Sequence, residues 1–260
     1  MERTLEACLR SVVAQDHEPL ELIVVDNHSS DATPAIARRY ADQLLLAGPE
    51  RSTQRNVGVA AASGEYVLWV DSDMVLPPRT VSAAVRVALE TGADAVSIPE
   101  ISVGPGYWTA CRALERSCYL DDPAMYYPRL LRRDVLQRLG GFDESMAGPE
   151  DVDLRLRLDA AGAVLAHCAD VHILHDEGRL TLRAILAKRV YYGRSLPSFA
   201  GAHPGALAGQ GRLTLAALAR HRRRLAHHPV LTGGIALMRA GEAAAYGVGY
   251  WTGRAGARSA

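Results

Sequence analysis

The most constraining stretch of the sequence is a short apolar run that ends in two aspartates. Residues 66–70 are apolar or aromatic without a break, Gly64 stands shortly before them, and Asp71 and Asp73 follow directly. A continuous apolar run of this length is typical of a strand buried on both faces, as in a parallel sheet covered by helices. Ligands of open α/β sheets bind at the carboxyl ends of the strands, which is where the two aspartates fall.

The spacing of these two aspartates indicates what they could bind. In an extended segment, side chains two residues apart point to the same side, so the carboxylates of Asp71 and Asp73 would lie on the same side of the chain. Two neighbouring carboxylates repel each other unless a cation lies near them, and oxygen ligands suit Mg²⁺ or Mn²⁺. The pattern alone fits a polar turn after a strand equally well.

Strand and helix patterns alternate through the first part of the chain. Predicted strands cover 21–26, 44–46, 66–70 and 94–98, and predicted helices cover 2–14, 51–62 and 79–90, with another ending at residue 40. Further on, helices are predicted at 133–139 and after residue 148, and short strands at 163–166 and 171–175. Residues 104–128, rich in Gly, Pro, Tyr and Trp, predict an irregular region that faces an acceptor. The alternation predicts an α/β fold with a mostly parallel sheet flanked by helices.

The charges are distributed unevenly between the two parts of the chain. The formal net charge is zero, but residues 1–177 hold 16 Lys and Arg against 28 Asp and Glu, whereas residues 178–260 hold 13 against 1. We therefore expect a domain at 1–178 and a basic, helical C-terminal extension at 179–260. Such an asymmetry predicts an anionic partner for the extension, either a membrane surface or nucleic acid.

The order of residues within the extension favours the membrane surface. Arginines cluster at 212–224, directly before an apolar, Gly- and Ala-rich stretch at 229–252. This combination predicts a helix that lies in the interface of an anionic leaflet. The alternative is a helical hairpin that packs back onto the domain or onto a second copy in a homo-oligomer. We do not expect nucleic acid as a partner, because aromatic residues do not interleave the basic run.

Two further features concern the cellular location. The four cysteines show no metal-binding spacing, which predicts buried, reduced thiols in a cytosolic protein. No window of 18 uninterrupted apolar residues occurs, so we expect no membrane-spanning helix. The expected location is therefore cytoplasmic, with the extension placing the protein peripherally on the inner face of the cell membrane.

Several short motifs follow one another in an order that suggests a family. They are Leu22-Ile23-Val24-Val25-Asp26 with Ser29-Ser30-Asp31-Ala32-Thr33, Arg55-Asn56-Val57-Gly58, Ala62-Ser63-Gly64-Glu65-Tyr66, Asp71-Ser72-Asp73, Gly140-Gly141-Phe142-Asp143-Glu144, and Glu150-Asp151-Val152-Asp153-Leu154. In this order and spacing the chain resembles the nucleotide-sugar glycosyltransferases of family 2, which have the GT-A fold. The resemblance extends over roughly residues 5–200. It implies an enzyme that transfers a sugar from a nucleoside diphosphate sugar.

The resemblance assigns donor-binding roles to three residues near the start of the chain. Asp26 would accept a hydrogen bond from the nucleotide base, most often uracil, and Asp31 would lie in the same pocket. Arg55 would be the cation on the base or phosphate side. Each has a plainer explanation, which is an exposed strand-end acid for Asp26, a helix cap for Asp31 and a surface ion pair for Arg55.

The resemblance also implies a metal site and a base. Asp73 would bind Mg²⁺ or Mn²⁺ at the donor diphosphate, with Asp71 facing the ribose or the metal-bound water. His175 would lie near the metal or the diphosphate, and His172 is the alternative histidine. A structural histidine at a strand end is the plainer explanation of either.

A carboxylate at the start of a later helix would activate the acceptor. Asp151 would deprotonate the acceptor hydroxyl from the side opposite the leaving group, which makes the reaction inverting, and Glu150 could take this role instead. The plainer explanation of this pair is stabilisation of a helix N-terminus. Tyr107, Trp108 and the pair Tyr126-Tyr127 could stack on an acceptor sugar, although core packing explains each of them as well.

One departure from the family concerns the N-terminus. Family 2 domains begin with a strand that supplies part of the nucleotide pocket, whereas this sequence enters directly at the following helix. We expect the natural start to lie about 10–20 residues upstream, the length of a strand with a short tail. The sequence thus predicts a metal-dependent, inverting transferase with a lipid-linked or cell-envelope glycan acceptor. The alternative is a catalytically silent protein that binds nucleotide sugars.

Overall fold

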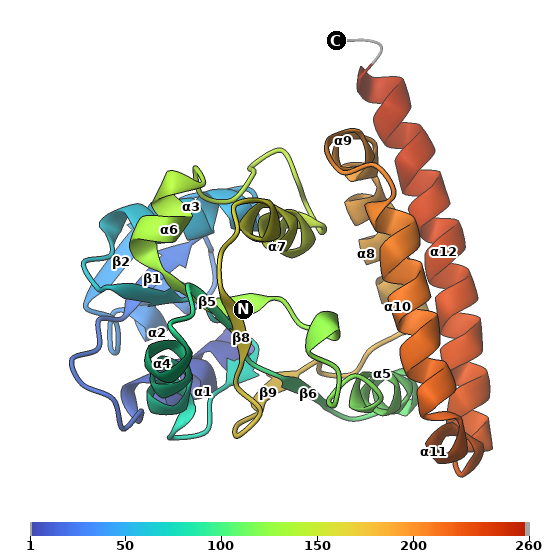
Figure 1. Ribbon diagram of the computed structural model, residues 1–260, viewed down its shortest axis with the longest axis horizontal. Coiled ribbons are helices and arrows are strands. Elements are labelled where there is room, and N and C mark those ends of the chain that lie inside the picture. The colour runs from blue at the N-terminus through green and yellow to red at the C-terminus, as the bar shows by residue number, and fades with distance from the viewer. Residues whose placement is uncertain (1, 258–260) are drawn as a thin grey trace. The chain divides into compact units, whose positions relative to one another are not determined.

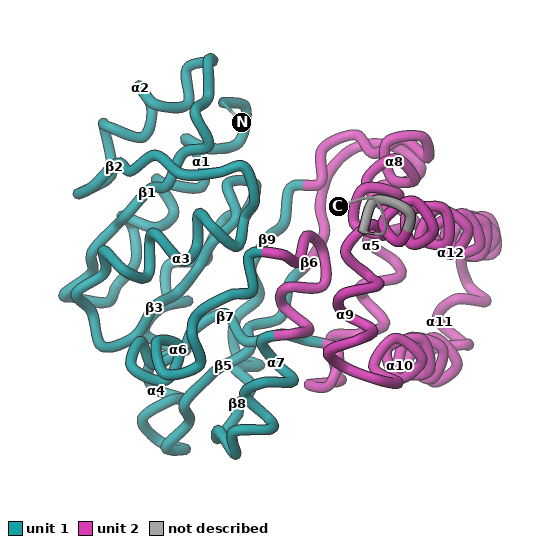
Figure 2. Tube along the Cα trace, turned by 90° about the horizontal axis from the view of Figure 1, so that it is seen from above, with its two compact units in different colours: residues 1–100, 126–144, 154–176 teal, residues 101–125, 145–153, 177–260 magenta. Residues whose placement is uncertain are grey.

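The computed structural model describes the backbone of residues 2–257 and the side chains of residues 2–254. The chain forms two compact units (Figure 2). The first comprises residues 1–100, 126–144 and 154–176, and the second comprises residues 101–125, 145–153 and 177–260. The chain passes between the units for the last time at residues 176 and 177, close to the boundary expected at 178, but the second unit also takes two earlier segments.

The first unit contains most of the alternating elements (Figure 1). Its helices are α1 (Glu2–Val13), α2 (Thr33–Ala37), α3 (Arg51–Ala61), α4 (Thr80–Thr91), α6 (Arg133–Arg138) and most of α7 (Glu150–Ala160). Its strands are β1 (Ile23–Asp26), β2 (Gln43–Leu46), β3 (Tyr66–Leu68), β4 (Met74–Val75), β5 (Ala95–Ser97), β7 (Pro128–Arg132), β8 (Leu165–His167) and β9 (Ile173–Asp176). The predicted helices and strands of this unit are found at similar positions, although the helix expected to continue to Tyr40 ends at Ala37. Strands β4 and β7 correspond to no predicted element.

The central sheet has the order β3-β7-β5-β8. Strand β7 runs antiparallel to both β3 and β5, and β5 runs parallel to β8, so β3, β5 and β8 share one direction. The predicted α/β class with flanking helices is confirmed, but the reversed strand β7 makes two of the three pairings in this sheet antiparallel. Strands β1 and β2 pair in parallel as a separate sheet, and a third sheet has the order β4-β9-β6, with β6 covering Glu100–Val103.

Apolar side chains fill both faces of the central sheet. On β7, Leu130 belongs to one core cluster and its neighbour Leu131 to another, as the alternation of a strand requires. The Leu130 cluster includes Val12 of α1 and Ala84 of α4, whereas the Leu131 cluster joins residues of α3, α6 and α7. Helices therefore cover the sheet on both sides, as expected for a strand run without polar residues. All four cysteines are free and buried, as predicted.

The second unit is mainly helical. Its elements are α5 (Tyr107–Ser117), the short 3₁₀ helix η1 (Pro123–Met125), α8 (Leu182–Gly193), α9 (Leu196–Ala202), α10 (Ala206–Arg220), α11 (Arg222–Ala226) and α12 (Pro229–Ala257). Cys111 and Leu114 of α5 pack with Ile235 and Met238 of α12. Among residues 2–257, no helix combines the length and apolar character needed to cross a membrane.

The prediction of an irregular region at 104–128 is wrong, because α5 occupies much of it. The helix begins after Gly104 and Gly106, both with positive φ angles, and these glycines contributed to the prediction of irregular structure. Its side that includes Cys111 and Leu114 is buried because α12 covers it. The helix therefore depends on a partner that is distant in the sequence.

Candidate functional site

The polar residues of the first unit gather where its strands end. Asp71 and Asp73 follow β3 and precede β4, and Glu100 stands three residues after the end of β5. Strand β9 pairs antiparallel to β4, with His175 opposite Met74. Because β3 and β5 run in the same direction, the residues after them lie along the same edge. Arg129 of β7 contributes to the same edge, since it contacts both Asp71 and Glu100.

Asp71 is surrounded by arginines. Its Oδ1 accepts a hydrogen bond from Nη2 of Arg55 at 3.2 Å, and Nη2 of Arg129 lies 3.7 Å from its Oδ2. Burial opposes ionisation of this carboxyl, but Arg129, Arg55 and Arg51 outweigh it and lower its pKa to about 2. Asp71 is therefore ionised at neutral pH, and its charge is already compensated by the protein.

The guanidinium of Arg55 is fixed on two sides. Besides its contact with Asp71, it lies 5.7 Å from the ring centroid of Trp69 and 5.1 Å from that of Phe142, and the two rings pack edge to face at 5.1 Å. The Arg55 side chain is 8% exposed. The plainer explanation of Arg55 as a surface ion pair is therefore wrong, because two aromatic rings and a carboxylate enclose its guanidinium.

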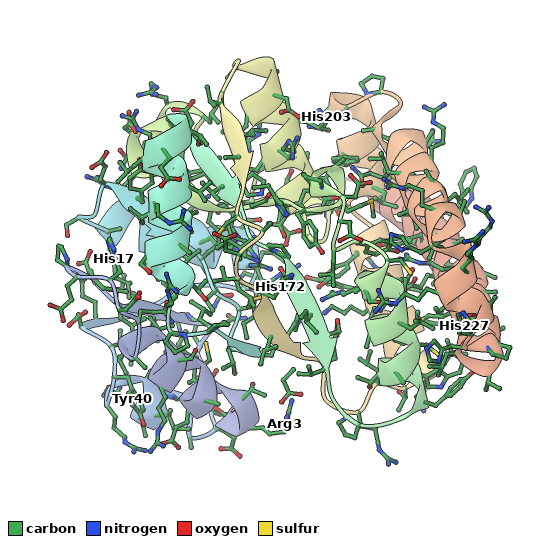
Figure 3. All side chains as sticks on the ribbon, turned by 60° about the horizontal axis from the view of Figure 1, so that its bottom comes forward. Arg3, His17, Tyr40, His172, His203 and His227 are labelled. Carbon is green, nitrogen blue, oxygen red and sulfur yellow. The ribbon has the colours of Figure 1, made fainter. Side chains whose placement is uncertain are left out.

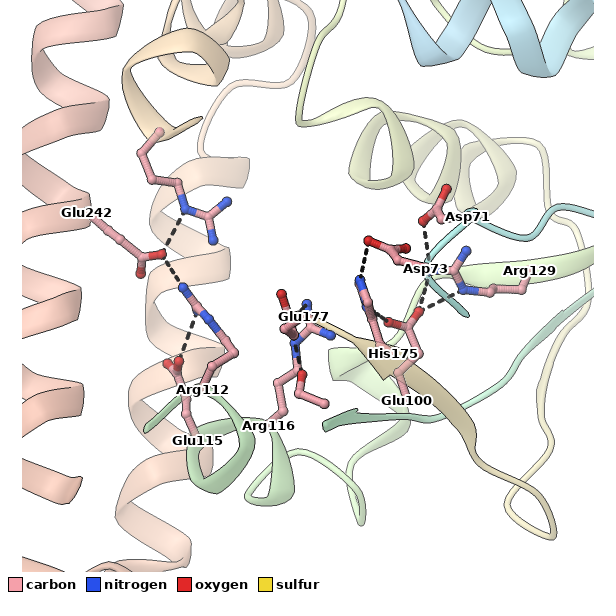
Figure 4. Close-up of polar contacts among 12 residues, drawn as sticks. Asp71, Asp73, Glu100, Arg112, Glu115, Arg116, Arg129, His175, Glu177 and Glu242 are labelled. Carbon is pink, nitrogen blue, oxygen red and sulfur yellow. Dashed lines mark hydrogen bonds and ion pairs between the residues drawn. The ribbon is translucent and has the colours of Figure 1, made fainter. Parts of the chain in front are cut away.

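A second set of contacts connects Asp73 to the same cluster through a histidine (Figure 4). Nε2 of His175 lies 3.4 Å from Oδ2 of Asp73, and its Nδ1 lies 3.2 Å from Oε2 of Glu100. The other oxygen of Glu100 accepts a hydrogen bond from Nε of Arg129 at 2.7 Å. One continuous series of polar contacts thus runs from Asp73 through Glu100 to Arg129 and Asp71.

The predicted metal ligands do not have equivalent surroundings. Asp73 and His175 place an oxygen and a nitrogen side by side, a donor pair that suits Mn²⁺ or Mg²⁺ when phosphate oxygens and water complete the shell. Asp71 instead faces two guanidinium groups. Within residues 2–254, no group of three His, Cys, Asp or Glu side chains is arranged to hold a metal ion. The pair formed by Asp73 and His175 therefore fits a cation better than the trio that includes Asp71.

The two aspartates predicted to bind the nucleotide lie at the end of β1 and just after it. Asp26 is 4% exposed, and its Oδ2 accepts a hydrogen bond from the backbone N–H of Ser29 at 2.8 Å. Asp31 accepts one from the backbone N–H of Thr33 at 3.0 Å, at the start of α2. Asp26 is thus not the exposed strand-end acid of the plainer explanation. Asp31 bonds the first residue of α2, but the N-cap position itself is Ala32, so Asp31 is not a helix cap in the strict sense.

The structure brings two of the sequence motifs into direct contact. Oδ1 of Asn56 accepts a hydrogen bond from the N–H of Phe142 at 2.8 Å, and its Nδ2 donates to the Phe142 carbonyl at 2.9 Å. Nδ2 also donates to Glu144 Oε1 at 2.8 Å. Gly141 has a φ of +76°, and an added Cβ would lie 2.5 Å from Asn56 Oδ1. The glycine and the asparagine therefore hold the loop that carries Phe142 beside Arg55.

The acids at the start of α7 belong to the second unit and differ in environment. Glu150 is 1% exposed, and its Oε2 accepts a short hydrogen bond from the Gly148 N–H. Asp153 is 2% exposed and lies 2.7 Å from Nε2 of His203, which Figure 3 labels. Asp151 is only half-buried. Of the two residues predicted as candidate bases, Asp151 is therefore the less buried.

The aromatic residues expected near an acceptor are largely engaged in packing. The Tyr107 hydroxyl donates a hydrogen bond to the Val230 carbonyl at 2.8 Å, and its ring packs edge to face on Trp108. Tyr126 is buried and stacks on His167. Packing thus accounts for Tyr107, Trp108 and Tyr126, as the plainer explanation states.

The sequence predictions did not include Glu100 or Arg129. Glu100 follows the buried run of β5 much as Asp71 follows that of β3, so its position after a strand could have identified it. Arg129 lies within a strand, where nothing in the local sequence indicates that its guanidinium reaches Asp71 and Glu100. Only the pairing of β7 between β3 and β5 reveals that contact.

Comparison with known proteins agrees with the motif order. The family model described as Glycosyl transferase family 2 matches residues 2–141. The chain is similar to the succinoglycan biosynthesis protein ExoA of Rhizobium meliloti, with 28% identity over 162 residues that cover 54% of this chain and 49% of that protein. It is also similar to a pre-mycofactocin glycosyltransferase of Mycobacterium tuberculosis, with 29% identity over 204 residues that cover 71% and 43%. The chain thus spans about half the length of these two curated relatives.

A solved structure provides the comparison of folds. A mannosyltransferase from Pyrobaculum calidifontis, in complex with GDP-Man and Mn²⁺, superposes with a TM-score of 0.62 and 21% sequence identity. The match covers 96% of this chain and 83% of that one. The predicted α/β fold of the GT-A type is confirmed.

Proposed function

The chain belongs to the glycosyl transferase family 2, and from that premise we propose that it transfers a sugar from a nucleoside diphosphate sugar to a hydroxyl acceptor. The observation that carries the proposal is the series of contacts from Asp73 through His175, Glu100 and Arg129 to Asp71. These charged groups lie at the strand ends of the first unit, where open α/β sheets bind ligands.

The donor would be held by fixed charges of the protein. Solved relatives of this fold bind GDP-Man in one case and UDP or UDP-GlcNAc in another. In this chain Asp26 would accept a hydrogen bond from the nucleotide base, which we propose is uracil, and Asp31 would support the loop beside it. Asp71, held by Arg55 and Arg129, would accept a hydrogen bond from the ribose. A carboxylate already paired with arginines can accept a hydrogen bond from a hydroxyl group without needing a metal beside it.

Asp73 and His175 are the residues that would hold Mg²⁺ or Mn²⁺. The cation would supply Lewis-acid stabilisation of the negative charge that develops on the leaving diphosphate. Oε2 of Glu100 would accept a hydrogen bond from Nδ1 of His175, and this contact would direct Nε2 toward Asp73. The two side chains are therefore oriented by the protein before any ligand binds.

Asp151 would be the base that accepts the acceptor's proton, which gives inversion at the anomeric carbon. Its half-buried position at the start of α7 supports this role better than the buried position of Glu150, whose Oε2 is engaged by Gly148. The acceptor would be a glycan or a lipid-linked intermediate of the cell envelope. The basic second unit would keep the protein peripherally attached at the cytoplasmic face of the membrane.

The test is a panel of nucleotide sugars screened with Mn²⁺ for thermal stabilisation and for release of the nucleoside diphosphate. We expect Asp73→Ala to weaken metal-dependent donor binding, and Asp151→Asn to retain binding while transfer falls by at least about a hundredfold. An Asp151→Asn variant that transfers normally would show that the base is assigned to the wrong residue.

The alternative function is binding of a nucleotide sugar without catalysis. The pairing of Asp71 with two arginines favours this alternative, because it leaves fewer carboxylates to hold a metal. The same panel separates the two functions, because a silent protein is stabilised by a donor and releases no nucleoside diphosphate.

A further inference from the structure

Helix α12 has its charges on the inside. From Pro229 to Gly253 its charged residues are Arg239 and Glu242. Glu242 is 2% exposed, and its Oε1 lies 2.5 Å from Nη2 of Arg112 and 2.8 Å from Nε of Arg189 (Figure 4). Arg239 lies 3.2 Å from Glu242 Oε2 and also pairs closely with Glu115. Both charges thus point toward α5 and α8 within the second unit.

The outward side of the same helix is apolar. Val230, Leu237, Val248 and Trp251 are 72%, 57%, 55% and 69% exposed. Their spacings of seven, eleven and three residues place them on one stripe of a helix with 3.6 residues per turn. The remaining exposed positions from 229 to 252 are Pro229, Gly233, Ala236, Ala240, Ala243, Ala244 and Thr252. We call this surface the α12 stripe, and it is about 30 Å long at 1.5 Å per residue.

An exposed apolar stripe of this length requires a partner. Single exposed apolar residues are normal on a soluble protein, but a contiguous row marks an interaction surface. The usual arrangement of a surface helix is reversed here, because the ion pairs are buried and the alanines, valines and leucine face outward. Packing within the second unit therefore does not account for the outer side of α12.

Both ends of the stripe are basic. Arg222 and Arg223 of α11, just before the helix, are exposed. At the other end, the Arg254 guanidinium lies 5.6 Å from the Tyr250 ring centroid and 5.8 Å from that of Trp251. An apolar row bounded by arginines and an exposed tryptophan has the character of a helix that lies at a membrane interface.

The charges decide between a membrane and a second copy of the chain. Between residues 178 and 260 Glu242 is the only acidic residue, and it is buried among three arginines. In either direction of pairing, two copies of the stripe would bring basic ends against basic ends with no exposed acid from this segment to compensate them. An anionic lipid surface would compensate both ends at once.

We propose that α12 lies in the interface of an anionic membrane, with the α12 stripe inserted among the lipids and Arg222, Arg223 and Arg254 at the headgroups. This inference rests on the membrane location proposed above and supplies the surface that makes the contact. It also explains the ion pairs that Arg239 and Glu242 make with residues of α5 and α8, because these pairs fix which side of the helix faces outward.

The test is sedimentation of the full chain with phosphatidylcholine vesicles, with and without phosphatidylglycerol. We expect binding that requires phosphatidylglycerol and falls as salt is raised, because the headgroup contacts are screened. Leu237→Gln and the double variant Arg222→Ser/Arg223→Ser should each reduce the bound fraction at least fivefold. In vesicles with brominated chains, the parent should lose tryptophan fluorescence that Trp251→Phe does not lose.

Matched controls come from exposed residues elsewhere in the chain. Leu89→Gln, at a position 67% exposed on α4, and the double variant Arg38→Ser/Arg79→Ser should bind as the parent does. Circular dichroism should show that Leu237→Gln keeps the parent's helix content, since the side chain lies mostly in solvent.

Two results would overturn the inference. The first is a parent that ignores anionic vesicles, or a Leu237→Gln variant that binds them like the parent. The second is a parent that light scattering shows to be a dimer and that Leu237→Gln converts to a monomer, because the stripe would then be a contact between copies. Donor hydrolysis in the same samples keeps the two proposals apart: vesicle binding without hydrolysis contradicts only the enzymatic function.

Discussion

Nε2 of His175 lies 3.4 Å from Oδ2 of Asp73, although the two residues belong to motifs that are far apart in the sequence. The pairing of β9 with β4 produces this proximity, since β4 follows Asp73 directly and β9 contains His175. The pair brings together the two residues that we propose hold a cation at the donor diphosphate. Oε2 of Glu100 lies 3.2 Å from the other ring nitrogen, Nδ1, and so contacts the far side of the imidazole.

Replacing Glu100 by Gln should loosen His175. A glutamine oxygen can still accept a hydrogen bond from Arg129, but the charge that fixes the imidazole is lost. We expect Mn²⁺ affinity in the presence of nucleoside diphosphate to fall about 10- to 100-fold, the usual effect of removing a partner behind a metal ligand. Calorimetric titration measures it, and Glu90→Gln on the exposed side of α4 is the control. An unchanged Mn²⁺ affinity would show that Glu100 serves only as the partner of Arg129 and does not orient His175.

Asp71 should make stability depend on pH in the acidic range. Its pKa is lowered in the folded state from an ordinary value near 4 to about 2, so the ionised form stabilises the fold. This contribution is present above about pH 4 and disappears as the pH falls toward 2, and it amounts to about 2 kcal/mol. Asp71→Asn should thus be less stable than the parent at pH 7, with the difference shrinking below pH 4. Chemical denaturation at several pH values checks this, and a constant difference would contradict it.

Gly141→Ala should destabilise the loop that encloses Arg55. The position has a φ of +76°, and the new methyl group would meet Asn56 Oδ1 at 2.5 Å. Strain and the loss of the Asn56 hydrogen bonds together should cost about 2–4 kcal/mol. Gly140→Ala is a matched control, because its φ is similarly positive and no atom lies within 4 Å of the added group. A smaller loss for Gly141→Ala than for Gly140→Ala would show that the contact with Asn56 is unimportant.

Glu242→Gln should destabilise the second unit. The substitution removes the carboxylate that Arg112, Arg189 and Arg239 share and leaves Glu115 as the remaining partner of Arg112 and Arg239. Burial makes the excess positive charge costly. We expect a loss of about 3–5 kcal/mol, as for other buried pairs with one partner removed. Thermal unfolding of the full chain reports it, with Glu90→Gln, an exposed partner of Arg86, as the control. Equal melting temperatures for the two variants would contradict the role of the buried cluster.

The polar residues show where sequence reasoning stops. Asp71 and Asp73 are detectable because they end a strand run that is apolar throughout, and the glycines at 140 and 141 stand out because few other residues adopt positive φ angles. Arg129 gives no such signal. Its partners Asp71 and Glu100 come from other strands, and a contact of that kind depends on sheet order.

Helix α5 illustrates the same limit in the fold. The glycines before its first residue suggested irregular structure. The buried face of the helix is recognised only from the tertiary structure, in which α12 covers Cys111 and Leu114. In the same way, the sequence shows that the run at 229–252 is apolar and contains two charges, Arg239 and Glu242, but it does not show which side of the helix they occupy.

By itself, the sequence determined the α/β class, the family and the strand ends that carry acids, because local periodicity and turn chemistry report directly on strands, helices and their boundaries. The tertiary structure alone decided that Asp71 is neutralised by arginines, that Asp73 pairs with His175, and that α12 turns its charges inward. These features arise from residues that are distant in the chain, and their electrostatics depend on distance and burial, which a linear pattern does not encode.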